Sequence, residues 1–147
     1  MEIIGHSIEE FRTRAFYIDK SLVFPCILLF IKIDKGGWFS LTIDEGKCIV
    51  SLEESEPKSI SLHEITDSFA YPIQKVDMLN KYAGRKLKNV MEYRLTKKDD
   101  LCIGIYLQFD SGGLSIIEND GGLSFFDGVC DEILNESQLM SSYDSLW

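Results

Sequence analysis

The chain of 147 residues has no long hydrophobic run, and it contains few prolines and only two histidines. Its longest apolar stretch, residues 22–33, is interrupted by Pro25, whereas a membrane-spanning helix needs roughly 20 apolar residues. The stretch also lacks the basic segment and the small-residue cleavage site of a secretory signal peptide. We therefore expect no membrane span, no export signal and a cytoplasmic location.

No CxxC pair occurs among the four cysteines, which are widely spaced at positions 26, 48, 102 and 130. Two disulfides are one interpretation of an even number, but each cysteine lies among apolar or strand-forming residues, which favours buried thiols. With only His6 and His63 to assist, the usual frames of a zinc site are missing. We expect no metal and no cofactor.

Catalytic motifs are also lacking. No GxSxG or HExxH frame surrounds the histidines, and nothing in the spacing of the 24 acidic residues selects a catalytic pair. The acids near residues 110–127 do not follow the order of an EF-hand loop. We expect that the protein is not an enzyme, and an unrecognised small hydrolase using His6 or His63 is one alternative.

Basic residues are absent after Lys98. The net charge is −9, with ten acids in residues 99–147, which argues against a general nucleic-acid binder. Residues 75–98 hold eight bases and two acids, so a small RNA-binding module that uses this segment with Tyr82 and Tyr93 is a second alternative. The other interpretation of the charges is structural, with solvated acids balanced by the basic segment.

With 45% hydrophobic and 12% aromatic residues, residues 1–147 should form a single globular domain. Short apolar runs separated by Gly and Asp predict an α+β fold with a curved, mainly antiparallel β-sheet built from two meanders, and one or two packed helices. Helices are expected near residues 72–83 and 129–140, and residues 3–17 are ambiguous between helix and strand. The expected strands cover residues 22–33, 38–43, 47–52, 60–65, 87–95, 101–109, 114–117 and 123–126.

The two predicted meanders resemble each other in sequence. Residues 33–37 match 109–113, and residues 40–46 match 115–121 after one gap. Either an old duplication or the independent selection of Asp and Gly at tight turns explains the match. Both explanations predict hairpins at these positions.

The acidic last third also contains aromatic residues, and protein interfaces favour aromatic anchors within a polar rim. A surface of one charge sign attracts an oppositely charged protein and speeds the encounter. Tyr143 and Trp147 are the expected anchors. The predicted binding surface comprises Asp110, Glu118, Asp120, Asp127, Asp131, Glu132, Glu136, Tyr143, Asp144 and Trp147.

Residues 37–44 (GWFSLTID), 69–73 (FAYPI) and 104–128 resemble the immunity proteins of bacterial contact-dependent growth inhibition and related polymorphic toxin systems. That class has many unrelated folds, so the resemblance implies a role and no catalytic residues. It implies a cytosolic antitoxin that binds a cognate toxin domain, often a basic nuclease, and blocks its active site or the entry of its substrate.

Overall fold

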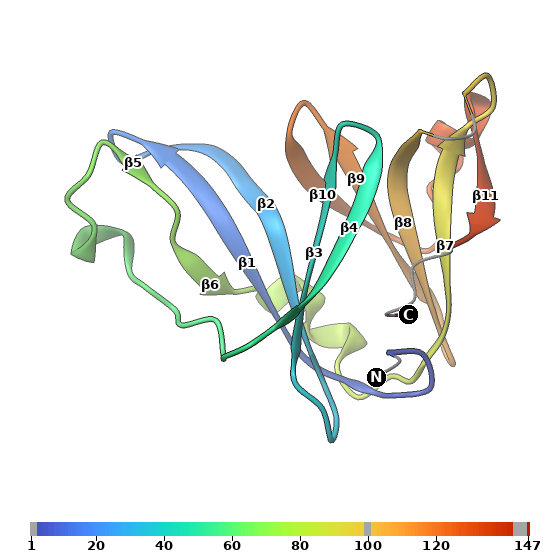
Figure 1. Ribbon diagram of the computed structural model, residues 1–147, viewed down its shortest axis with the longest axis horizontal. Coiled ribbons are helices and arrows are strands. Elements are labelled where there is room, and N and C mark those ends of the chain that lie inside the picture. The colour runs from blue at the N-terminus through green and yellow to red at the C-terminus, as the bar shows by residue number, and fades with distance from the viewer. Residues whose placement is uncertain (1–2, 99–100, 143–146) are drawn as a thin grey trace.

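The chain folds into two antiparallel β-sheets that pack against each other (Figure 1). The structure is a computed structural model that describes residues 3–98, 101–142 and 147. Within these residues the only helices are short 3₁₀ helices. None of them has the length and apolar character that crossing a membrane requires.

The N-terminal sheet begins with a four-stranded meander, whose members are β1 (Ile8–Ile18), β2 (Ser21–Ile33), β3 (Trp38–Asp44) and β4 (Lys47–Glu53). After the 3₁₀ helix η1 (Leu62–Glu64), the short strands β5 (Phe69–Ala70) and β6 (Ile73–Lys75) return to pair with β1. The resulting order is β4-β3-β2-β1-β5, with β6 also on β1. The ambiguous N-terminal segment is therefore mainly a strand.

The C-terminal sheet repeats this path. Its meander comprises β7 (Leu87–Leu95), β8 (Cys102–Phe109), β9 (Gly113–Asn119) and β10 (Gly122–Asp127). The 3₁₀ helix η3 (Asp131–Asn135) then leads to β11 (Ser137–Ser141), which pairs with β7 and gives the order β10-β9-β8-β7-β11. The 3₁₀ helix η2 (Asp77–Tyr82) connects the sheets. The matching residues 33–37 and 109–113 thus occupy equivalent turns, between the second and third strands of each meander.

The predicted tight turns are confirmed at the hairpins. Glu45 and Gly46 between β3 and β4 both have positive φ, as do Asp120 and Gly121 between β9 and β10. This conformation suits the right-handed twist of a two-residue hairpin, and Gly adopts it without steric cost.

The inner faces of both sheets form one shared core. It includes Leu29, Ile31 and Leu41 from the first sheet and Ile105 and Leu107 from the second, all nearly inaccessible to solvent. A Cβ on Gly122 would lie 2.5 Å from Cδ1 of Phe24, so glycine lets that ring lie directly on β10. The two ends of the described chain lie close together (Figure 1), and the Ile4 amide donates to the Trp147 carbonyl at 2.8 Å. Ile3 and Trp147 both belong to the shared core.

The two predicted helices are not confirmed. Residues 72–83 instead form β6 and η2, because the edge of β1 pairs with residues 73–75. Residues 129–140 form η3 and most of β11, because β7 offers the same kind of open edge. The strand predicted at residues 60–65 is also wrong, since η1 occupies part of that segment. In all three places sheet pairing or loop packing outweighs the local sequence pattern.

Two bulges change which side chains of β7 and β8 face the core. The register shifts between Leu87 and Asn89, and again between Tyr93 and Arg94. Strict alternation along β7 would leave Glu92 solvated with Lys88, but Glu92 is only 6% exposed. Its carboxylate accepts a hydrogen bond from Arg94 at 3.2 Å. Tyr93 is also buried, but it packs on the outer face of the sheet. Bulges re-aim side chains in this way without a clear sequence signature.

Tyr93 fixes the connection between β10 and η3 to the outer face of the C-terminal sheet. Its hydroxyl lies 2.6 Å from the Ser115 hydroxyl and accepts a hydrogen bond from the Cys130 amide at 2.9 Å. Ser115 in turn donates to the Gly128 carbonyl at 2.6 Å. Burial raises the pKa of Tyr93 and is only partly offset by these hydrogen bonds.

Replacing Tyr93 by Phe should destabilise the protein by about 1–3 kcal/mol, because the buried Cys130 amide loses its acceptor. Urea unfolding monitored by circular dichroism measures this change. Tyr106→Phe is the matched control, since the Tyr106 hydroxyl forms no hydrogen bond with the described residues although the ring packs in the same cluster. Equal stability losses in the two variants would contradict the role given to the hydroxyl.

The four cysteines all lie within the described part of the chain, and none forms a disulfide there. Burial raises the pKa values of the Cys26 and Cys102 thiols to about 12, so neither forms the reactive thiolate near pH 8. Cys48 is partly exposed.

A thiol reagent at pH 8 should therefore modify Cys48 first and should reach Cys26 and Cys102 only after denaturation. Mass spectrometry of peptides from labelled native and urea-treated protein measures the order. Cys48→Ser should remove the fast phase of labelling. Rapid labelling of Cys26 in the native protein would contradict this expectation, because it would show that the reagent reaches the shared core.

Candidate functional site

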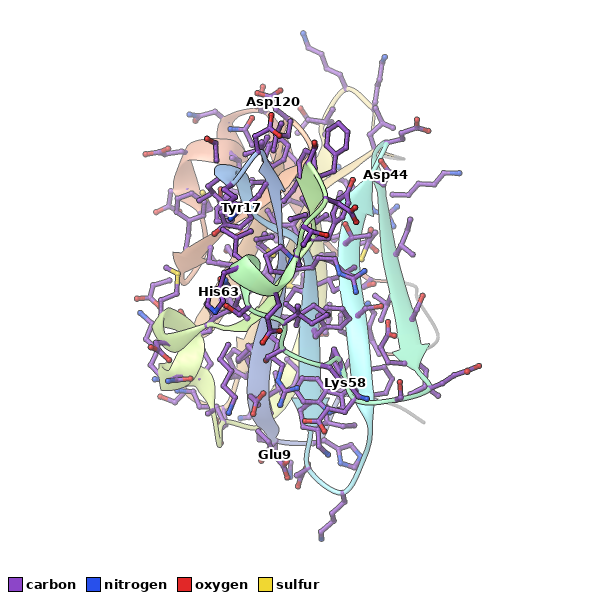
Figure 2. All side chains as sticks on the ribbon, turned by 90° about the vertical axis from the view of Figure 1, so that its left-hand side faces the viewer. Glu9, Tyr17, Asp44, Lys58, His63 and Asp120 are labelled. Carbon is purple, nitrogen blue, oxygen red and sulfur yellow. The ribbon has the colours of Figure 1, made fainter. Side chains whose placement is uncertain are left out.

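The predicted acidic surface divides into separate places on the C-terminal half. Asp110 follows β8, whereas Asp120 lies in the β9–β10 hairpin at one end of the molecule (Figure 2). Asp131 and Glu132 belong to η3, and Glu136 precedes β11. Asp127 lines a different pocket from Glu118, Glu132 and Glu136, so the predicted acids do not all share one site.

Three of these acids line one pocket on the outer face of the C-terminal sheet. The pocket has a volume of about 330 Å³, and we call it the acidic pocket. Its acidic members are Glu118, Glu132 and Glu136. Its other lining residues are Leu95, Ile103, Ile117, Asn119, Ser124, Phe126, Cys130 and Ile133.

The floor of the acidic pocket is apolar because of how β8 is built. Gly104 faces Ile117 and Tyr93 closely: a Cβ there would lie 2.6 Å from Cδ1 of Ile117. The bulge at this point places Ile103 in the same outer cluster, rather than in the core with Ile105. Glycine and bulge together make room for the aliphatic side chains below the carboxylates.

The carboxylates of the acidic pocket are not neutralised by neighbouring bases in the described part of the chain. No Lys, Arg or His of these residues lines the pocket, and Glu118, Glu132 and Glu136 form no ion pair with them. Glu118 is held in position, since its Oε1 accepts from the Gly121 amide at 2.9 Å. Beyond Glu136 the charge of the surface changes from negative to positive, because a neighbouring pocket is lined by Lys97 and Lys98.

Asp127 differs from the other predicted acids because its carboxylate already has a basic and a phenolic hydrogen-bond partner within the protein. Its carboxylate accepts hydrogen bonds from Lys81 Nζ and from the Tyr82 hydroxyl. The charge balance between the acidic third and the basic segment, which was the structural interpretation of the sequence, therefore applies at Asp127.

The predicted aromatic anchors are not available as a pair. Trp147 is 5% exposed and belongs to the shared core, so it packs inside the protein instead of presenting an anchor. Tyr143 and Asp144 lie outside the described residues. Among the described residues of the C-terminal sheet and its connections, the exposed large apolar side chains are Phe126 and Val129, at 44% and 37% exposure, and Phe126 lines the acidic pocket. The sequence signal that could have identified Phe126 is its position at the end of β10.

The alternative RNA-binding surface lacks stacking aromatics. Tyr82 and Tyr93 are 1% and 0% exposed, so neither offers a face to a base. Arg85 lies over the Tyr82 ring and donates to the Ser111 carbonyl at 2.8 Å. The basic segment thus uses part of its charge within the protein.

The histidines do not assemble a hydrolytic site with the pocket carboxylates. His6 Nδ1 lies 3.2 Å from Asp34 Oδ1 at a partly exposed position, and the exposed His63 contacts the Ser61 hydroxyl. Neither imidazole lines the acidic pocket. Among the described residues, no group of three or more His, Cys, Asp or Glu is arranged to hold a metal ion.

Comparison with known protein families, with curated proteins and with solved structures finds no match to this chain.

Proposed function

We propose that the protein is an immunity protein that binds a basic toxin domain through the acidic pocket of its C-terminal sheet. The observation that carries this proposal is the convergence of Glu118, Glu132 and Glu136 above an apolar floor. The toxin is expected to be a nuclease, whose cationic substrate site such a surface can cover, and the location is expected to be cytoplasmic.

The chemistry of the acidic pocket suits a Lys or Arg side chain. The methylene stem of either residue packs against aliphatic walls while its charged head stays near carboxylates. Leu95, Ile103 and Ile133 supply such walls. Arg fits better than Lys because its planar guanidinium pairs with two oxygens of one carboxylate.

Exposed apolar groups extend the surface beyond the charged centre. Phe126 lies at the pocket wall, and Val129 follows it in the connection to η3. An apolar anchor excluded from water within a polar rim slows dissociation, whereas the surrounding charges mainly speed association. The pocket therefore provides both components of a tight inhibitor.

The first test is genetic. We expect the reading frame to lie beside a gene for a toxin, and coexpression of this chain should restore growth of cells that produce the toxin domain. Persistent growth arrest despite abundant folded chain would count against the proposal.

The second test locates the interface. Glu132→Gln together with Glu136→Gln should lower the association rate for the toxin domain by about tenfold at low salt, because both substitutions remove charge from the pocket. The matched control is Asp110→Asn with Asp120→Asn, which removes the same charge elsewhere, and Asn tolerates the positive φ of Asp120. Stopped-flow or biosensor kinetics measure both. Equal effects of the two pairs would indicate net charge instead of the pocket.

A further inference from the structure

The N-terminal sheet ends in a strand whose outer edge is not covered by another strand. β4 (Lys47–Glu53) pairs with β3, and among the described residues no strand pairs with its other side. It is the longest of the strands that end the two sheets, and its register with β3 runs without interruption. In Figure 2 it lies at the right-hand side of the sheet, where Asp44 is labelled. A long, regular edge of this kind is a template for pairing with another strand.

The turn before β4 determines which backbone groups reach this edge. Both residues of the two-residue turn have positive φ, and in such a hairpin the flanking pair, Asp44 and Lys47, exchange hydrogen bonds. Hydrogen-bonded and non-hydrogen-bonded positions then alternate along the strand. The N–H and C=O groups of Val50 and Leu52 therefore point away from β3, and neither residue has a backbone hydrogen bond to another described element.

Apolar side chains of β4 are exposed to solvent on both faces of the sheet. Ile49 is 45% exposed, and Leu52 is 57% exposed although it pairs with the buried Phe39 and so lies on the core side. Native proteins protect edge strands with proline, with bulges or with charges inside the strand. Between its two charged ends β4 has none of these, so nothing in the strand itself prevents pairing.

One antiparallel register pairs two copies of β4 along their whole length. Hydrogen bonds form between residues that both point to the shared edge, so Val50 of one copy must lie opposite Cys48, Val50 or Leu52 of the other. The register with Val50 opposite Val50 pairs all seven residues of β4, whereas the other two leave five pairs. The full register has a two-fold axis at Val50, and two-fold symmetry is the commonest symmetry of homo-oligomers.

The full register places opposite charges beside each other at both ends of the strand pair. Lys47 of each copy lies opposite Glu53 of the other, because both residues are three positions from Val50. These positions do not exchange hydrogen bonds, and side chains at such positions are the closest across an antiparallel pair. Neither Lys47 nor Glu53 forms an ion pair with the described residues of its own chain. Self-association therefore supplies the opposite charge that each of them lacks.

The full register also covers exposed apolar surface. On the core side, Leu52 lies opposite Cys48 of the other copy. On the outer side, Ile49 lies opposite Ser51. Removing such surface from water favours association. A single strand pair is nevertheless a small interface, so we expect a dissociation constant on the order of micromolar.

We propose that the chain forms a symmetric homodimer by antiparallel pairing of its β4 strands, with Val50 on the two-fold axis and Lys47 opposite Glu53 of the second copy. The N-terminal sheets of the two copies then form one continuous sheet. The acidic pocket lies on the outer face of the other sheet, which this pairing does not use. The dimer therefore carries two acidic pockets.

Sedimentation velocity of the purified full chain, from low micromolar to millimolar concentration, measures the association. The original chain should change from monomer to dimer as its concentration rises. Lys47→Glu and Glu53→Lys should each weaken dimerisation at least about tenfold, because each places like charges at both ends of the strand pair. A chain that stays monomeric throughout, or charge reversals that leave the dimer unchanged, would overturn the proposal.

Combining the two reversals tests the register. The double variant Lys47→Glu with Glu53→Lys restores opposite charges at both ends and should dimerise like the original chain. A mixture of the two single variants should form heterodimers, since one chain then has two acidic strand ends and the other has two basic ones. If the double variant remained as weak as the single variants, the pairing of Lys47 with Glu53 would be wrong.

Lys88→Glu and Glu64→Lys are the matched controls. They make the same charge changes at exposed positions outside β4, and neither original side chain forms an ion pair with the described residues. Neither control should alter dimerisation. An effect equal to that of Lys47→Glu or Glu53→Lys would indicate a response to net charge and contradict pairing through β4.

Leu52→Pro interrupts the edge without changing the charge. It removes an N–H group that points away from β3, and proline is tolerated in an edge strand when its N–H side faces solvent. This variant should stay monomeric while its circular dichroism spectrum remains that of the original chain, and a folded variant that still dimerises would refute pairing through β4. If Leu52→Pro fails to fold, the charge variants still decide the question.

The toxin domain is absent from all of these measurements, so the homodimer and the toxin interface fail independently. The variant with Glu132→Gln and Glu136→Gln should dimerise like the original chain, since both residues lie outside β4.

Discussion

Each sheet has one strongly apolar face, and the two apolar faces pack against each other. This packing determines which of the remaining side chains lie on the outer faces of the sheets. Ile31 and Leu41 on one sheet and Ile105 and Leu107 on the other are at most 1% exposed. A register slip of one residue would turn such a set toward solvent, at a cost of about 25 cal/mol for each Å² of apolar surface. The shared core thus fixes which residues remain for the outer faces, and the acidic pocket is built from those.

The outer faces use the same framework for opposite chemistry. In each sheet the segment after the fourth strand crosses the outer face, covers a small apolar cluster and returns as an edge strand. In the N-terminal sheet the cluster includes Phe30 and Trp38 beneath arginines, whereas in the C-terminal sheet glutamates surround it. The repeated path positions a pocket beside each crossing segment, and the charges within the pocket come from local sequence.

The sequence predicted the elements that depend on local signals, such as the hairpins at Asp44–Lys47 and Asn119–Gly122, and the two meanders. It did not predict β6 or β11, because those residues become strands only when the open edges of β1 and β7 are present. For the candidate site, the acidic character of the last third of the chain could be predicted from the sequence. The convergence of Glu118 with Glu132 and Glu136 in one pocket could not. That convergence depends on the crossing segment and on a bulge near Ile103.

The meander layout also separates folding into local and distant steps. Within each sheet the first four strands pair with sequence neighbours, and isolated hairpins form on the order of 1–10 μs. The contact of Phe24 with Gly122 instead joins residues from opposite halves of the chain, which requires closing a long loop. Docking of the two preformed sheets should therefore limit the refolding rate. We expect refolding on the order of milliseconds to seconds, the range that all-β sandwiches show.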